Sequence, residues 1–447
     1  MAETLKSMYN GGSAGILYTD RRNFYVDPGV TKELWTDVAP FTTVISNRET
    51  RSVPDPVFKM FEHRNPWVKQ KFVINNGGGY TVPDNDTGVA SVAIDGIVGL
   101  SSSADSSWVG LVVEIWNSAE TTNRGCAVIT ASSTTLTLKS LANGAISVVD
   151  NDICHIVGNA QGEGTDSPEA WADELQVVYN SCQIFKTPLQ ITGTLLAASL
   201  RGESSELARL RAQKSQEHKM QKEKAFLFGQ RDSGTGLGEA AYDAGNKASN
   251  VDETFADDGR TDADGNVLRT TYGVVSAFAT YGETGSYDYK NVFTVSEATY
   301  TYSSFVDDME KVFQYVPEAG VKRAFCGAGA LGYWSKMAGT SGMAGSSGWT
   351  VNVSDMKRDS LGFNYKILET PHGILQLIPT PALRGPYNGY MLAVSEENLF
   401  HAQYRAPMYQ TNIKTDNALD AVKDQYFSDE GVGMQLMESH HLFKVTS

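Results

Sequence analysis

The longest helical pattern in the sequence covers residues 202–228 and is mostly polar. It has no proline, begins among small polar residues that suit an N-cap, and stops before Gly229, which predicts a left-handed glycine at the helix end. Across residues 211–219 the single apolar side chain is Ala212, and apolar positions gather near the two ends. Such a helix is typical of one that bridges over a domain surface, although an ordinary solvated helix is an equally good interpretation.

Residues 302–316 carry the clearest amphipathic pattern, extending over about four turns, which predicts a helix packed on a core. Elsewhere, short apolar runs bounded by turn residues predict strands. These strands are expected at residues 54–67, 68–75, 109–116, 126–130, 134–139, 153–157, 175–185, 321–326, 363–370, 373–379 and 389–394. Residues 270–279 and 291–295 are expected to form strands or short core segments.

Between residues 88 and 157 charged residues become sparse, and short apolar runs alternate with Gly, Asn, Asp and Ser turns. This pattern predicts a small all-β module inserted into the chain. Residues 1–50 offer little that could close a core, apart from a short helix expected at residues 31–39 and ended by Pro40. We therefore expect an N-terminal arm that is either mobile or held by a neighbour.

The composition is that of a globular protein, because 41% of the 447 residues are hydrophobic and 20% are charged. No apolar run is long enough for a membrane span, and the N-terminal residues carry no secretory signal. The four cysteines are scattered without a CxxC pair, so we expect free thiols. The net charge of −15 argues against a protein that grips nucleic acid through its own surface. It fits a protein that lies near DNA without sticking to it, and it fits equally well a protein whose negative charge serves only solubility.

The sequence contains no P-loop, no GxSxG nucleophile motif and no HExxH zinc motif. The glycines at 234–238 follow a charged helix end instead of a strand, which argues against a dinucleotide loop. Residues 262–266 resemble part of an EF-hand, but the register lacks the final glutamate. The seven histidines show no metal-ligand spacing. We therefore expect no catalytic, cofactor-binding or metal-binding residues, while a site assembled from distant residues stays open.

Five segments carry a resemblance to a known family, namely residues 55–63, 153–168, 179–194, 206–229 and 430–445. In order and spacing they resemble the major capsid proteins of tailed phages, and more specifically the family with a β-module inserted in its extended loop. The resemblance implies an α+β, HK97-like fold with an N-arm, an extended loop carrying the all-β insertion, a spine helix, and peripheral and axial domains. It implies a structural protein that self-assembles into pentamers and hexamers of an icosahedral phage head enclosing double-stranded DNA.

This resemblance divides the chain into five parts. A shell subunit completes its apolar surface against copies of itself, so an arm and a two-stranded loop that look unfinished alone are expected. Residues 1–48 form the N-terminal arm, 49–180 the extended loop with its all-β insertion at 85–158, 181–301 the peripheral domain with the spine helix at 202–228, 302–395 the axial domain, and 396–447 the return to the peripheral domain.

Four aromatic residues, Phe58, Phe61, Trp67 and Phe72, are the candidate inter-subunit contacts. Packing within their own domain is the alternative, because most buried aromatic side chains serve their own core. The resemblance implies further copies of the chain as partners, with portal, scaffold and decoration proteins as additional candidates. It places packaged DNA nearby without specific binding, and it implies no membrane and no cofactor. The implied location is the virion shell, and the host cytoplasm during assembly.

A β-rich adhesin or tail-fibre-like binding protein, with residues 88–157 as its recognition module, is the alternative function. The long helix rich in Lys and Glu argues against it, as does the absence of long repetitive β stretches. The mass of the purified assembly distinguishes these classes, because a shell is far larger than a fibre trimer or a small enzyme oligomer.

Overall fold

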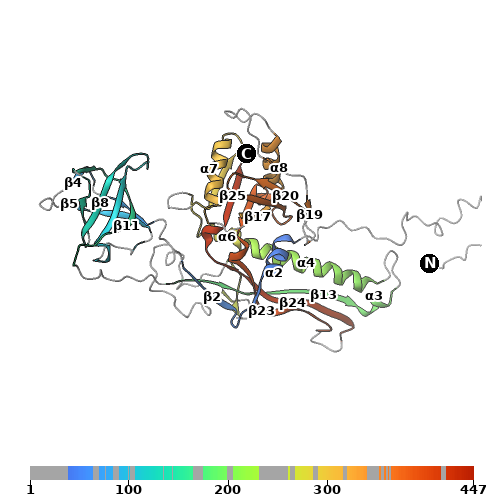
Figure 1. Ribbon diagram of the computed structural model, residues 1–447. Helices are drawn as coiled ribbons and strands as arrows, with labels where there is room; N and C mark the ends of the chain where they lie inside the picture. The colour runs from blue at the N-terminus through green and yellow to red at the C-terminus, as the bar shows by residue number, and fades with distance from the viewer. Residues whose placement is uncertain are drawn as a thin grey trace, which may run out of the picture.

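The computed structural model describes a body of two sheets and a long helix, together with a small barrel that stands apart in Figure 1. The described residues run from 39 to 446, except 64–69, 76, 84–89, 99, 101–105, 134, 143, 165–174, 199–204, 231–259, 262–266, 285–289, 316–319, 340–351, 354–356, 359–360, 362–363 and 414–418. The composition of these elements is α+β, as the sequence predicts.

A four-stranded sheet with the long helix α4 (Glu206–Phe228) along it forms one part of the body (Figure 1). Side chains of β13 alternate between exposed and buried, and the buried ones contact α4. Pro188 is tolerated within β13 because this is an edge strand. In spatial order the strands are β1 (Thr50–Ser52), β23 (Leu399–Gln410), β24 (Ala421–Met434) and β13 (Gln183–Thr192), and the short helix α3 (Gly193–Ala197) follows β13.

Helix α4 confirms the long polar helix, but its C-terminal end differs from the prediction. Ser205 is the N-cap, and its hydroxyl accepts a hydrogen bond from the Ala208 N–H. The prediction of a left-handed glycine is wrong, since Gly229 has φ −56° and ψ 143°. Glycine is required there for another reason: a Cβ at Gly229 would lie 2.4 Å from the Thr271 carbonyl oxygen.

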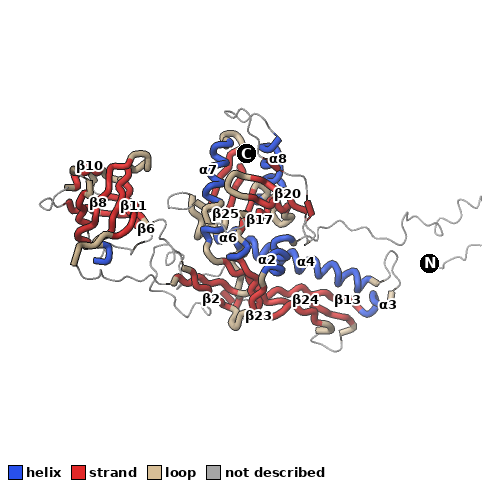
Figure 2. The backbone as a smooth tube through the Cα atoms, in the orientation of Figure 1, coloured by secondary structure: helices blue, strands red, loops and turns tan. Residues whose placement is uncertain are grey.

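Helix α2 (Pro40–Arg48) corrects the expectation for the N-terminal region. The helix predicted at residues 31–39 lies outside the described residues except for Ala39. Pro40 is the first residue of α2, where its missing N–H is no loss. Phe41 is fully buried, and its ring contacts Phe325 of the eight-stranded sheet with centroids 5.1 Å apart. Residues 40–48 therefore belong to the core rather than to an arm, and Figure 2 shows α2 beside α4. Residues 1–38 lie outside the described residues.

An eight-stranded sheet forms the second part of the body, with helices α7 (Tyr302–Val312) and α8 (Ala328–Gly339) sharing its core. Helix α7 confirms the amphipathic prediction. In spatial order the strands are β16 (Val292–Ser296), β25 (His441–Thr446), β22 (Tyr390–Val394), β17 (Val321–Cys326), β21 (Ile374–Pro379), β20 (Asn364–Glu369) and β18 (Asn352–Val353), while β19 (Lys357–Arg358) pairs with β20. Because β16 and β25 belong here, the sheet takes strands from both sides of the predicted boundaries at 301/302 and 395/396.

Short elements complete the body. They are α6 (Val274–Ala277), the 3-10 turns η4 (Gly385–Tyr387), η5 (Glu396–Asn398) and η6 (Met437–Ser439), and the hairpin of β14 (Arg260–Thr261) with β15 (Val267–Leu268).

The predicted all-β module is a small barrel with its own core. Its sheet has the order β5-β9-β8-β7-β11-β3-β6, and β5 and β6 at the two ends are separated in sequence only by Ala93, so the sheet nearly closes on itself. The strands are β3 (Lys71–Ile74), β4 (Tyr80–Val82), β5 (Ala90–Val92), β6 (Ile94–Val98), β7 (Leu111–Trp116), β8 (Asn123–Ser132), β9 (Leu136–Ser140), β10 (Ile146–Val148) and β11 (Ile153–Asn159), with the 3-10 turn η3 (Ser106–Trp108).

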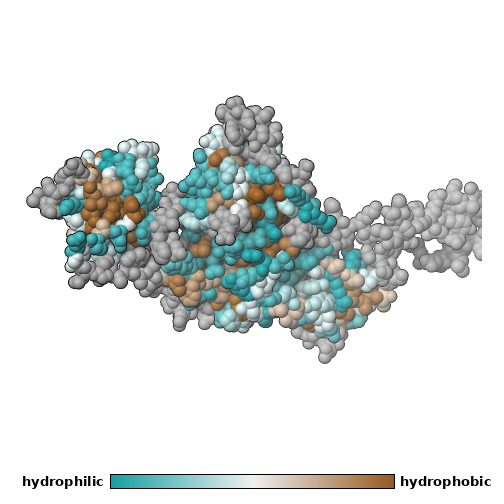
Figure 3. Space-filling view, viewed as in Figure 1, coloured by the Kyte–Doolittle hydropathy of each residue, from teal (hydrophilic) through white to brown (hydrophobic). Residues whose placement is uncertain are grey.

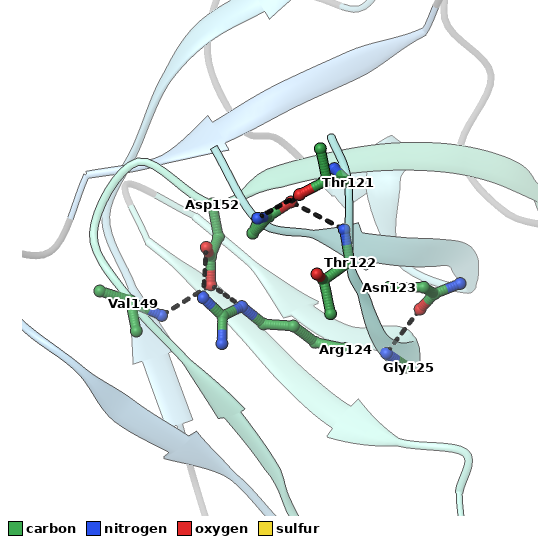
Figure 4. Close-up of polar contacts among 8 residues, drawn as sticks. Thr121, Thr122, Asn123, Arg124, Gly125, Val149 and Asp152 are labelled. Carbon is green, nitrogen blue, oxygen red and sulfur yellow. Dashed lines mark hydrogen bonds and ion pairs between the residues drawn. The ribbon is translucent and has the colours of Figure 1, made fainter. Parts of the chain in front are cut away.

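The barrel begins earlier than the predicted insertion at 85–158, because β3 pairs with both β11 and β6. At one end of the barrel an ion pair joins Arg124, near the start of β8, to the buried Asp152 just before β11 (Figure 4). Asp152 is 1% exposed, and its carboxylate lies 3.0 Å from Arg124 Nη2 and accepts a hydrogen bond of 2.7 Å from the Val149 N–H. A nearly closed barrel of this kind leaves little free strand edge for unwanted pairing.

We predict that a fragment of residues 70–164 folds on its own, because the buried core cluster of the barrel shares no residue with the clusters of the body. The fragment should show a cooperative thermal transition by circular dichroism, with near-ultraviolet signal from Trp108, which is buried against Phe72 at 5.7 Å. A fragment without near-ultraviolet signal and without a cooperative transition would contradict this prediction.

A two-stranded ribbon, β2 (Val57–Glu62) with β12 (Gln176–Ser181), lies between the barrel and the body in sequence. It packs on the four-stranded sheet through Phe58 and Met60, which are buried with Phe400 and Ala402 of β23. The strand predicted at 175–185 is thus two strands, β12 and β13.

Candidate assembly surfaces

The polar side chains in the middle of α4 hold the helix on the sheet. Arg211 donates to the fully buried Asp424 at 2.8 Å, and Lys222 lies 3.0 Å from the fully buried Glu430. Between them His218 contacts the Thr187 hydroxyl at 2.9 Å through Nδ1 and the Ser428 hydroxyl at 3.0 Å through Nε2. The helix that looks solvated in sequence is therefore fixed to β13 and β24 by buried polar contacts. The bridging interpretation fits better than the solvated one.

These buried groups have shifted pKa values with clear causes. Burial, together with the Lys222 charge, lowers the pKa of His218 to about 4. Burial acts to raise the pKa of Glu430, but His401 and Lys222 outweigh it, so the pKa of Glu430 is lowered. The pKa of Asp424 is lowered in the same way, because hydrogen bonds from Tyr409, Asn412 and Arg211 outweigh its burial.

Glu223 of α4 holds α2 in place. Its carboxylate accepts hydrogen bonds from the Phe41 N–H at 3.0 Å, the Thr42 N–H at 2.7 Å and the Thr42 hydroxyl at 2.7 Å. Ala39 at the N-cap offers no side-chain oxygen, so Glu223 caps α2 from a distant part of the chain. Burial raises the pKa of Glu223, and the bonds from Thr42 and Phe41 oppose that shift.

The face of the four-stranded sheet that points away from α4 carries several exposed apolar side chains. Ile184 is 41%, Met408 42% and Tyr404 38% exposed. Between them Phe427 is covered by the Arg405 guanidinium at 4.5 Å, and Arg405 also pairs with Asp429 at 3.0 Å. The ribbon covers only the part of this face at Phe400 and Ala402. We call the remainder, Ile184, Tyr404, Arg405, Met408 and Phe427, the outer face.

A second apolar group lies where β13 leads into α3. Leu195 and Leu196 of α3 are 40% and 49% exposed, and Leu419 near the start of β24 is 41% exposed. The Gly193 N–H donates to the Asp420 carbonyl oxygen at 3.1 Å, so the segments of α3 and β24 lie side by side. Figure 3 shows hydrophobic colour along the lower surface of the body and at its α3 end. Because contiguous exposed apolar patches are typical of protein-binding surfaces, this group is a candidate assembly surface.

The four predicted contact residues have different fates. Phe61 on β2 is 65% exposed and remains a candidate for contact with another subunit. Phe72 is fully buried in the barrel, and Phe58 is 6% exposed against Phe400 with ring centroids 6.0 Å apart. Both therefore serve the core of their own chain, which corrects their assignment as inter-subunit contacts. Trp67 lies outside the described residues.

Sequence reasoning missed the outer face and the α3 group. Side chains of β13 alternate between the two faces of the sheet, so Ile184 lies on the face opposite to that of its neighbours Gln183 and Phe185. This alternation could have revealed that Ile184 is exposed. Nothing in the sequence signals Met408 or Tyr404, since their exposure depends on the pairing of β23 with β24.

The described part of the chain holds no group of three or more His, Cys, Asp or Glu side chains that could bind a metal ion. Among its helices, none combines the length and the apolar character that crossing a membrane requires. The described cysteines are free thiols, as predicted.

Comparison with known proteins gives a match over most of the chain. The family model described as SU10 major capsid protein matches residues 40–446. No curated protein matches the chain.

Several solved structures are similar at low identity. A capsid of a native GTA particle, computed with C5 symmetry, is 8% identical with a TM-score of 0.45, covering 99% of this chain and 100% of that one. A structure titled Mycobacterium phage Patience is 12% identical with a TM-score of 0.36, covering 64% and 78%. The mature capsid of bacteriophage PhiM1 is 8% identical with a TM-score of 0.37, covering 65% and 78%.

Proposed function

The chain belongs to the SU10 major capsid protein family, and we propose that its copies join through Phe61, the outer face and the α3 group to form the hexamers and pentamers of an icosahedral head. As a major capsid protein it is a structural component of the virion shell and not an enzyme. The observation that carries the proposal is the family match over residues 40–446. The adhesin alternative has no comparable support.

The exposed apolar residues support this assignment of surfaces. Phe61 projects from a ribbon whose other face is packed on the body, so its exposed ring is available to a neighbour. The outer face mixes exposed aliphatic side chains with the Arg405–Asp429 pair, a composition that suits the core of an interface with a polar component. Large aromatic side chains and arginine supply most of the binding energy in protein interfaces.

The domain roles extend the proposal, with an HK97-like arrangement as their basis. The ribbon β2–β12 and the barrel form the extended loop with its insertion, α4 is the spine helix, and the four-stranded sheet is the peripheral domain. The eight-stranded sheet with α7 and α8 forms the axial domain.

Further partners follow from the same role. Portal, scaffold and decoration proteins are the proposed additional partners of the shell. The head encloses double-stranded DNA, and the net charge of −15 supports an inner wall that repels phosphates weakly instead of binding them. An inner surface dominated by Lys and Arg in an imaged particle would contradict this part of the proposal.

Replacing Phe61 by serine tests the assembly surface. We expect the variant to remain folded but to form particles with a yield at least about tenfold lower at equal concentration, because truncating an aromatic anchor weakens each contact by about 1–2 kcal/mol. Particle mass by light scattering or mass photometry gives the readout. The matched control is Leu268→Ser, which also truncates an exposed apolar side chain, outside the proposed surfaces. Equal yields from the two variants would refute the role of Phe61.

A further inference from the structure

The chain passes from the four-stranded to the eight-stranded sheet through residues 435–440, which we call the crossing segment. Leu436 in this segment has φ 50°, a left-handed conformation that costs free energy for a leucine. On the side of the eight-stranded sheet, the buried Lys322 ammonium donates to the Ser439 carbonyl oxygen at 2.9 Å, and the Asn291 amide donates to the Met437 carbonyl oxygen at 3.3 Å. The strained conformation is thus held by contacts from outside the segment.

The ribbon holds the crossing segment from the other side. Glu62, the last residue of β2, is 4% exposed, and its carboxylate accepts a hydrogen bond from the Leu436 N–H at 2.7 Å. Beside it the Gln435 side-chain amide donates to the Phe61 carbonyl oxygen at 3.1 Å. Burying a carboxylate costs free energy unless it is well hydrogen-bonded. Because the Glu62 carboxylate accepts such a bond from the strained Leu436, the local structure depends on this contact.

The same end of the ribbon is where the chain leaves for the barrel. Glu62 pairs with Gln176, the first residue of β12. In sequence, β3 of the barrel follows β2, and β12 follows β11 of the barrel. Both connections to the barrel therefore start beside Glu62, while the opposite end of the ribbon is joined to β13 through Cys182, whose N–H donates to the Pro56 carbonyl oxygen at 2.7 Å.

We infer that Glu62 is a positioning residue: by holding the end of the ribbon on Leu436, it fixes the point from which the barrel leaves the body. The barrel and the crossing segment are then coupled, because a displacement of the ribbon end removes the partner of a strained backbone N–H. The inference deepens the proposed function, since it states how the extended loop is set for assembly. The coupling itself rests only on the contacts within one chain.

Hydrogen exchange of the full chain before assembly tests the inference, with Glu62→Leu, Glu62→Gln and the control Glu49→Leu. Glu62→Leu removes the acceptor, so we expect exchange in peptides covering residues 435–440 and 57–62 to accelerate about tenfold or more. Glu62→Gln keeps an acceptor oxygen at the same length and should restore most of the protection. The control Glu49→Leu removes a carboxylate that pairs with Arg51 on the surface, so it should leave the exchange rates of both peptides unchanged.

Unchanged exchange at 435–440 in Glu62→Leu would overturn the inference, as would equal acceleration in the glutamine variant. Should Glu62→Leu fail to fold, Glu62→Asp draws the acceptor back from the Leu436 N–H by one methylene group. Faster exchange at 435–440 in that variant than in Glu62→Gln supports the inference, and equal exchange overturns it. The Phe61→Ser assembly assay tests the proposed assembly surface and not the role of Glu62. Normal shells from Phe61→Ser would refute that surface and leave the conclusion about Glu62 unaffected.

Discussion

Replacing Glu223 by alanine is expected to lower the free energy of unfolding of the unassembled chain by about 3–5 kcal/mol. The carboxylate accepts three hydrogen bonds from the first turn of α2, two from backbone N–H groups and one from the Thr42 hydroxyl. No side chain at Ala39 can replace it, and Phe41 is fully buried, so water cannot take over the bonds without opening the core. Each buried donor left without a partner costs about 1–3 kcal/mol.

Urea denaturation of the unassembled protein measures this loss, with Glu217→Ala as the matched control. Glu217 lies on the same helix and pairs with Lys214 on the surface, where an ion pair contributes at most about 1 kcal/mol. Glu223→Gln should be intermediate, because one amide oxygen remains. A loss for Glu223→Ala no larger than for Glu217→Ala would show that α2 is held by its apolar contacts alone.

The elements that depend on local pattern could be predicted from the sequence. Helix α7 has apolar residues at helical spacing, and α4 has a serine N-cap followed by an uninterrupted run without proline or glycine. The hairpin of β20 and β21 follows from two apolar runs around a short turn. In each case the residues that determine the element lie within it.

The partners of the polar residues in α4 could not be predicted. Arg211 forms an ion pair with Asp424, and Lys222 forms one with Glu430. Both carboxylates lie about two hundred residues further along the chain, on a strand whose hydrophobic pattern is irregular. The same limit explains Phe72. The sequence offers Phe72 as an inter-subunit contact, and only the strand pairing with β11 places it in the barrel.

Strand β2 of the ribbon illustrates why assembly surfaces are harder to predict than cores. Phe58 and Phe61 belong to one strand and have the same side chain, yet one is 6% and the other 65% exposed. The difference follows from the alternation of β2 once the ribbon lies on β23. Aromatic composition therefore indicates that a segment packs against something, whereas only the pairing decides whether that partner is its own chain.

Acidification from pH 6.5 to pH 4.5 is expected to destabilise the folded chain through its buried histidines. His218, His440 and His441 are buried, and burial lowers the pKa of His218 to about 4 and that of His440 to about 3. The pKa of His441 is lowered by its burial and by the charges of Lys322 and His440. Below pH 6.5 the unfolded chain binds protons at these positions and the folded chain does not, so stability falls as the pH falls.

Each such histidine contributes up to about 1.4 kcal/mol per pH unit in this window, so the three together remove several kcal/mol of stability. Lys322 adds little to the change of stability with pH in this window. Burial lowers its pKa to about 7 in the folded chain, and its pKa values in the folded and unfolded chain both lie above pH 6.5. The lowered pKa values of Asp424 and Glu430 act with the same sign, but only below about pH 4.5, where unfolded carboxylates take up protons.

Urea midpoints of the unassembled protein between pH 6.5 and 4.5 measure the slope, and His218→Gln should remove about a third of it. Replacing His155, on the surface of the barrel beside Glu120, should leave the slope of the body unchanged. A stability that stays level down to pH 4.5 would mean that the buried rings already carry protons at neutral pH. His218 would then have to donate from both nitrogens to the hydroxyl groups of Thr187 and Ser428, which can accept as well as donate. The slope therefore decides whether α4 is held on its sheet by a neutral ring or by a charged one.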